Sequence, residues 1–304
     1  MNTQHLFIIN PTAGKKDITE QLTAKIADLN LKEKHTIKVT EFKGDALNYV
    51  REFVSGTDDF VRVYSCGGDG TLNEVINAVQ GLPNCAVGVI PTGSGNDFAR
   101  CFTDDPASLT ELSRTVLNGE VKSVDCFKCG DIRCLNVVSV GFDTAVCKNM
   151  VRFKRWPGVS GSLAYKLAIV YCLFSKRRHK YTVFADGKKL DTNGKPYLLA
   201  VGGNGNYYGG GIKATPGAEL DDGLIDLVYV TTVSVPTFAK MLGTFTRGEH
   251  VDNPKMPFVQ HCKCKSFKIV ADKPVDIGFD GEIYSINNPV VEVVPGGQKI
   301  IVPR

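Results

Sequence analysis

The stretch that decides the fold is residues 65–79, Ser-Cys-Gly-Gly-Asp-Gly-Thr-Leu-Asn-Glu-Val-Ile-Asn-Ala-Val. Residues 60–64 before it alternate and are rich in strand formers, whereas the apolar residues after the glycines recur at helical spacing. The stretch therefore predicts a strand, a glycine turn and a helix. Three glycines let the backbone approach a ligand closely, and the first amides of a helix carry a partial positive charge, which suits a phosphate.

A carboxylate inside this turn makes the prediction more specific. Asp69 would repel a phosphate unless a divalent cation lay between the two groups. We therefore predict a nucleotide site that works with Mg²⁺. Taken alone, the glycines are more typical of an ordinary loop between a strand and a helix.

A second turn of the same kind follows about one supersecondary unit later. Residues 87–90 have the pattern of a buried strand, and Gly-Ser-Gly-Asn-Asp-Phe-Ala-Arg follows at 93–100. Together with Asn-Pro-Thr-Ala-Gly at 10–14 and Gly-Gly-Asp-Gly-Thr at 67–71, it resembles the three nucleotide-side motifs of the diacylglycerol kinase catalytic-domain family. The chain most resembles the soluble bacterial lipid kinases within that family. This resemblance covers essentially the whole chain and implies an active cleft between two domains.

The composition is that of a globular protein with room for two cores. The chain has 304 residues, of which 43% are hydrophobic and 22% are charged. Its longest apolar run, 167–174, is far too short to span a membrane, and the N-terminus lacks a signal-peptide pattern. We expect a cytoplasmic protein, with peripheral contact at the inner face of the membrane left open. Its ten cysteines are scattered, which favours reduced thiols.

Positive charge is concentrated in the segment 148–180. Nine Lys and Arg residues lie between residues 144 and 185, with no Asp or Glu among them, although the whole chain carries a net charge of only +4. The same segment holds the only tryptophan, Trp156. Basic residues interleaved with aromatics suit an anionic membrane surface, and the alternative is a solvated basic face over a core helix. We expect no nucleic-acid partner, and we leave a homodimer open.

The first half of the chain alternates strands and helices. Strands are expected at 5–9, 36–40, 60–64 and 87–90, with helices between them and another over 109–117. The turn at 10–16 is no Walker A loop, because Ile9 stands where the first glycine should be and Lys16 replaces the Ser or Thr. We predict a three-layer α/β nucleotide-binding domain at 1–125, with its ligand at the carboxyl ends of parallel strands.

The second half has short strand-like runs separated by turns such as Asp186-Gly187 and Asp280-Gly281. We predict an antiparallel β-sandwich domain at 126–289 that binds the lipid substrate, with helical insertions near 161–174 and 236–245. The family resemblance implies that residues 290–304 return to the first domain.

The resemblance assigns the catalytic carboxylates. Asp69, Asp97 and Asp125 match three aspartates that organise the catalytic Mg²⁺ through water in the family. Asp-Gly-Glu at 280–282 matches the motif that supplies a general base. The sequence leaves open whether Asp280 or Glu282 receives the proton, and we favour Asp280.

The resemblance also implies two sets of ligands. A structural Mg²⁺ would be held by Asp222 and by the backbone carbonyls of Glu219 and Leu224, in a turn that lacks the spacing of an EF-hand. The residues expected near ATP are Asn10, Pro11, Thr12, Ala13, Gly14, Thr40, Gly67, Gly68, Asp69, Gly70, Thr71, Leu72, Asn73 and Ser94.

The favoured interpretation is a kinase that uses ATP and Mg²⁺ to phosphorylate a membrane-borne alcohol, with diacylglycerol converted to phosphatidic acid. Three alternatives stay open. The acceptor could be another lipid alcohol such as a sphingoid base or ceramide, the chain could be an NAD kinase-like enzyme, or it could be a nucleotide-binding regulator without catalysis. The pattern of glycines and carboxylates does not reveal the shape of an acceptor pocket.

Overall fold

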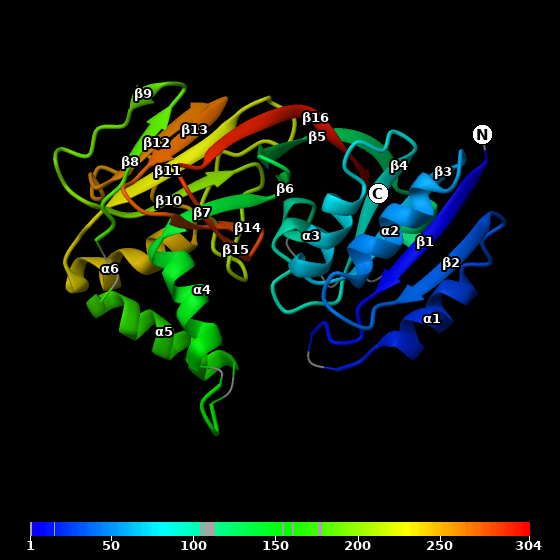
Figure 1. Cartoon of the computed structure of the whole chain (residues 1–304). Coiled ribbons are helices and arrows are strands. Elements are labelled where there is room, and N and C mark those ends of the chain that lie inside the picture. The colour runs from blue at the N-terminus through cyan, green and yellow to red at the C-terminus, as the bar shows by residue number, and fades with distance from the viewer. Residues whose placement is uncertain are drawn as a thin grey trace.

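A computed structural model describes residues 2–14, 16–103, 105, 113–153, 155–159, 161–175 and 178–304. They form two domains, the first at the right of Figure 1 and the second at the left. The described part of the chain contains no helix that is long and apolar enough to cross a membrane.

The first domain alternates strands and helices as predicted. Its elements are β1 (Thr3–Ile9), α1 (Thr19–Asp28), β2 (Lys34–Val39), α2 (Asp45–Ser55), β3 (Phe60–Gly67), α3 (Asp69–Ala78) and β4 (Cys85–Pro91). A 3-10 helix, Phe98–Cys101, and a π-helical turn, Ser113–Leu117, follow. The remainder of the helix predicted over 109–117 lies outside the described residues. Strands β2, β1, β3 and β4 pair in this order, and all are parallel.

Helices cover both faces of this parallel sheet. Along β1, Leu6 and Ile8 pack into the core that lies under α2 and α3. Phe7 and Ile9 pack on the opposite face, against Leu22 and Ile26 of α1. Because alternate side chains of a strand point to opposite faces, a strand covered on both sides must be apolar along its whole length. The predicted three-layer α/β architecture is confirmed.

The second domain is a β-sandwich covered by helices on one side. Its elements are β5 (Glu120–Cys129), β6 (Ile132–Cys134), β7 (Val137–Gly141), α4 (Phe142–Phe153), α5 (Gly161–Ser175), β8 (Thr182–Ala185), β9 (Lys188–Lys189), β10 (Tyr197–Gly203), β11 (Ile225–Thr231), α6 (Val235–Thr246), β12 (Val259–Cys264), β13 (Ser266–Val270), β14 (Val275–Phe279), β15 (Glu282–Ile286) and β16 (Val290–Val302). An antiparallel sheet in the order β12-β11-β10-β7-β14-β15 packs against β5, β6, β8, β13 and β16.

The outer face of the six-stranded sheet is covered by α4, α5 and α6. Phe142 of α4, Ala168 of α5 and Phe238 of α6 share one core with residues of β10 and β11. Helix α6 begins after Ser234, whose hydroxyl accepts a hydrogen bond from the Thr237 amide at 3.3 Å. The helices predicted near 161–174 and 236–245 correspond to α5 and α6, whereas α4 was not predicted.

Two long strands run through both domains (Figure 1). Strand β16 pairs with β13 and β5 near its start, and with β5 and the parallel strand β4 near its end. The predicted boundary at residue 125 therefore falls inside β5, and only the last part of 290–304 pairs with β4. The domains are joined by a continuous ribbon of two strands.

We predict that Asn204, which links β5 to the turn between β6 and β7, is important for stability. It is fully buried, and its Nδ2 donates to the carbonyls of Asp125 and Leu135, both at 2.8 Å. Replacement by leucine, which has a similar volume, would leave two buried carbonyls unpaired and cost about 2 kcal/mol. Urea unfolding of Asn204→Leu should show a lower midpoint than the wild type. An unchanged midpoint would contradict the role assigned to this side chain.

Candidate active site

The two glycine turns of the first domain touch each other. They follow β3 and β4, which are parallel neighbours. A Cβ added to Gly93 would lie 2.4 Å from the Cα of Gly68, so no side chain fits between the two turns. The glycines thus bring the carboxyl ends of two strands, and the polar residues that follow them, to one point.

Asp69 and Asp97 meet at this point. Asp69 begins α3, and its Oδ1 accepts a hydrogen bond from the backbone amide of Asp97 at 2.8 Å. Burial, followed by the negative charge of Asp97, raises the pKa of Asp69 to about 6. Gly95 leaves room for this carboxylate, because a Cβ there would lie 2.7 Å from its Oδ2.

A glycine loop of the second domain holds Asp97. The amides of Gly210 and Gly211 donate to its carboxylate at 2.8 to 3.0 Å. Both glycines have positive φ, at 84° and 109°, a conformation that other residues rarely adopt. Burial raises the pKa of Asp97 despite these two donors. The contact between this loop and Asp97 was not predicted from the sequence.

Asp280 lies in the turn between β14 and β15, and its carboxylate is held by four donors. Oδ1 accepts from the amides of Asn136 and Val137 and from the thiol of Cys134, whereas Oδ2 accepts only from the Leu135 amide. Burial raises the pKa of this group. Its negative charge also raises the pKa of Asp69 and of Asp97. Three of the predicted catalytic carboxylates, from both domains, are therefore close enough to interact electrostatically.

Glu282 faces the first domain, where Lys43 Nζ lies 2.5 Å from its Oε2. Asp125 is placed differently. Its two carboxylate oxygens accept from the amides of Gly223 at 2.6 Å and Gly296 at 2.8 Å. These contacts join β5 to a turn and to the bulge of β16. The catalytic role suggested for Asp125 stays a prediction.

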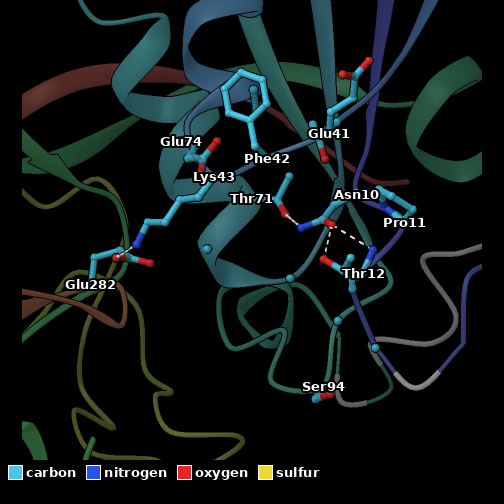
Figure 2. Close-up of a pocket in the computed structure, with 17 residues that line it drawn as sticks. Asn10, Pro11, Thr12, Glu41, Phe42, Lys43, Thr71, Glu74, Ser94 and Glu282 are labelled. Carbon is cyan, nitrogen blue, oxygen red and sulfur yellow. Dashed lines mark hydrogen bonds and ion pairs between the residues drawn. The ribbon is translucent and has the colours of Figure 1, made fainter. Parts of the chain in front are cut away.

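A cavity of about 440 Å³ opens beside the glycine turns (Figure 2). It is lined by ten of the residues predicted near ATP, namely Asn10, Pro11, Thr12, Ala13, Gly14, Thr40, Gly68, Gly70, Thr71 and Ser94. Of the other four, Gly67 ends β3, Asp69 turns toward Asp97, Leu72 packs in the core, and Asn73 is buried against Asn77. Figure 2 shows Asn10 and Thr71 pointing toward each other, and Asn10 Nδ2 donates to the Thr71 hydroxyl at 2.9 Å.

Several residues that line this cavity were not predicted from the sequence. The lining also includes Glu41, Phe42, Lys43 and Glu74. Phe42 is 63% exposed, which is unusual for a large aromatic side chain. The sequence does not show exposure, so it carries no signal for this residue. Glu74 accepts from the Gly44 amide at 2.9 Å and so fixes the start of α2.

The residues at the cavity fit a magnesium nucleotide. Backbone amides at the start of α3 face the cavity and suit phosphate oxygens. Asp69, Asp97 and Asp280 are crowded and partly desolvated, so that a nearby cation would relieve their mutual repulsion. The turn predicted to hold a structural Mg²⁺ does not fit as arranged, because Asp222 already accepts from Lys263 Nζ at 2.7 Å and from the Leu224 amide at 3.0 Å.

We predict that removing the charge of Asp69 stabilises the metal-free protein. The pKa of Asp69 rises from 3.8 to about 6 on folding, so its contribution to stability is full below pH 4 and is lost as the pH rises through 6. At pH 8 the ionised group then costs about 3 kcal/mol, at 1.36 kcal/mol per pKa unit. In EDTA, Asp69→Asn should unfold at a higher temperature than wild type at pH 8, with a smaller difference at pH 5. A lower unfolding temperature at pH 8 would refute this assignment.

Comparison with known proteins gives the family. The model of the diacylglycerol kinase catalytic domain matches residues 4–129, and that of the YegS C-terminal NAD kinase beta sandwich-like domain matches residues 136–302. A diacylglycerol kinase of Bacillus subtilis (strain 168) is 27% identical over 90% of this chain and 88% of its own length. A diacylglycerol kinase of Staphylococcus saprophyticus is 28% identical over 93% and 90%.

The fold is shared with solved structures. A crystal structure of a diacylglycerol kinase from Bacillus anthracis superimposes with a TM-score of 0.72, at 24% identity, over 98% of this chain and 96% of that chain. The suspected resemblance and the two-domain fold are confirmed. The chain belongs to the family of kinases acting on an alcohol group in which a diacylglycerol kinase catalytic domain is followed by a YegS-type β-sandwich domain.

Proposed function

We propose that this protein is a lipid kinase that uses ATP and Mg²⁺ to phosphorylate the hydroxyl of a membrane lipid, with diacylglycerol converted to phosphatidic acid. One observation carries the proposal. Asp69 and Asp97 of the nucleotide domain share a buried region with Asp280 of the second domain, beside a cavity that fits a nucleotide. A regulator that only bound nucleotide would need no such carboxylate from the second domain.

Phosphoryl transfer needs positioning and charge neutralisation more than covalent chemistry by the protein. The amides at the start of α3 would orient the phosphates, and Asp69 and Asp97 would hold Mg²⁺ through water. When bound, the ion would neutralise charge on the transferring group. Asp280 would take the proton of the acceptor hydroxyl at Oδ2, the oxygen that accepts only one hydrogen bond from the protein.

The surroundings of the two candidate bases favour Asp280 over Glu282. Burial raises the pKa of Asp280, and a base with a higher pKa accepts a proton more readily. Glu282 is instead engaged by the Lys43 ammonium across the cleft. We assign Glu282 to holding the two domains together at the mouth of the nucleotide cavity.

An apolar cavity in the second domain supports a lipid as acceptor. It has a volume of about 80 Å³ and lies between α4, α5, α6 and β10. Its walls are largely apolar, and they include Phe142, Ile169 and Met241. Gly209, next to the amides that hold Asp97, also lines it. These walls suit methylene groups better than the sugar hydroxyls of NAD, and a volume of about 80 Å³ takes only a short part of an acyl chain.

The α4–α5 hairpin supports contact with a membrane surface. It projects away from the sandwich (Figure 1). Trp156 is 51% exposed and Phe174 is 75% exposed, and a groove of about 880 Å³ beside α4 is lined by Arg152, Arg178 and other basic residues. Exposed aromatics beside cations are typical of proteins that bind anionic lipid surfaces. Lys154, Lys176 and Arg177 of the predicted basic segment lie outside the described residues.

We predict that phosphate from labelled ATP appears in phosphatidic acid when the protein is given Mg²⁺ and mixed micelles of diacylglycerol. Parallel reactions contain ceramide, sphingosine or NAD. Asp280→Asn should lose about 10²- to 10⁴-fold in kcat, because the acceptor proton loses its base. Glu282→Gln, the matched variant two residues away, should keep activity within tenfold.

The outcomes of this assay separate the alternatives. Label in NAD would replace the lipid acceptor, and label in ceramide or sphingosine would replace diacylglycerol. Equal turnover by wild type and Asp280→Asn would remove the proposed base. Because Asp280 also accepts hydrogen bonds from the β6–β7 turn, the variant's unfolding temperature and its binding of a fluorescent ATP analogue are measured beside turnover.

We also predict that Trp156 reports membrane binding. It is the only tryptophan and is exposed in the turn after α4, so its emission should shift to the blue when vesicles of phosphatidylglycerol are added. Vesicles of phosphatidylcholine should have little effect. Arg155→Glu should weaken the response, whereas Lys189→Glu, on the distant strand β9, should not. An unchanged emission with anionic vesicles would contradict membrane binding by the hairpin and favour a basic face that is exposed to solvent.

A further inference from the structure

Three carboxylates gather in the turn that leads into β11. They belong to Glu219, Asp222 and Asp226, and one ammonium, that of Lys263 on β12, reaches all three. Lys263 Nζ lies 2.7 Å from Asp222 Oδ2, 3.4 Å from Asp226 Oδ2 and 3.8 Å from Glu219 Oε1. This is the turn in which the family resemblance places a structural Mg²⁺.

The strand pairing fixes this lysine in place. Asp226 and Lys263 are directly opposite each other in the antiparallel ladder of β11 and β12. Such cross-strand neighbours stay within reach without any movement of the backbone. Asp226 is 2% exposed and Lys263 is 32% exposed, so the ion pair between them is screened less than one on the open surface.

The carboxylates have little capacity left for a metal ion. Asp222 Oδ1 accepts from the Leu224 amide, and its Oδ2 accepts from Lys263. Asp226 Oδ1 lies 2.7 Å from His261 Nε2. A divalent cation on Asp222 would lie beside the ammonium, and like charges at such a distance repel.

We propose that the Lys263 ammonium takes the place of the divalent cation at this turn, so that the turn keeps its structure without metal. A single positive charge that comes from the neighbouring strand offsets part of the repulsion among the three carboxylates. The proposal does not depend on the function proposed above.

The position of the turn links the Lys263 ion pairs to the junction between the domains. The amide of Gly223 donates to Asp125 Oδ2 at 2.6 Å, and the Asp125 amide donates to the carbonyl of Leu220 at 2.7 Å. Asp125 in turn accepts from the Gly296 amide in the β16 bulge. Lys263 thus stabilises the turn that anchors the ribbon between the two domains, at a place where a lost ion would loosen the junction.

The test uses the full chain and measures thermal unfolding without nucleotide, in EDTA and in 5 mM Mg²⁺ or Ca²⁺. Lys263→Met should unfold a few degrees lower than wild type in EDTA and recover part of the loss when the cation is added. Lys265→Met, two residues away and exposed, is the matched control and should behave as wild type. In the double variant Lys263→Met with Asp222→Asn, the recovery should disappear.

Metal binding provides a second readout that does not depend on the Lys263 variant. After dialysis against Ca²⁺, wild type and Asp222→Asn should contain the same amount of the metal. Extra metal in the wild type that Asp222→Asn removes would overturn the proposal, since the ion would then bind beside Lys263. Equal unfolding temperatures of wild type and Lys263→Met in EDTA would also overturn it.

Discussion

The structure depends on buried carboxylates that are held by backbone amides of the opposite domain or of a neighbouring turn. Asp97 belongs to the first domain but accepts from Gly210 and Gly211 of the second. Asp280 belongs to the second and is surrounded by the amides of residues 135–137. Burial alone would drive these groups toward the neutral form, and the donated hydrogen bonds partly offset that cost. The negative charge that the proposed mechanism requires is thus kept in a region that excludes much of the water.

The ribbon of β5 and β16 determines how the two halves of the site meet. Both strands belong to both domains, so the domains are joined by a β-ladder that is interrupted by the bulge between Val294 and Gln298. Asp125 sits where β16 bulges between Val294 and Gln298, and it joins the bulge to the second domain. A chain linker of ordinary length would allow free domain motion. Here two paired strands take the place of such a linker, and the ion pair of Lys43 and Glu282 bridges the cleft between the domains.

The sequence predicted local features well and distant pairings poorly. The glycine turns at 67–71 and 93–97 were predictable because strand, turn and helix signals follow one another directly in the chain. The partners of these turns were not, because Gly210 is 113 residues from Asp97 and Lys43 is 239 residues from Glu282. Lys263 illustrates the limit most clearly. The acidic turn looked like a cation site because nothing in its own sequence shows which residue the neighbouring strand places opposite it.

The charges around the nucleotide cavity favour the proposed need for Mg²⁺. Among its described lining residues, Glu41, Glu74 and Glu282 carry negative charge, and Lys43 is the single lysine or arginine. That lysine is already paired with Glu282, so the side chains alone would repel a free triphosphate. In the proposed function, attraction would come from backbone amides and from a cation that arrives with the nucleotide. If the proposed function holds, a divalent cation on the nucleotide would reduce the repulsion from Asp69 and Asp97, and nucleotide without metal would be disfavoured there.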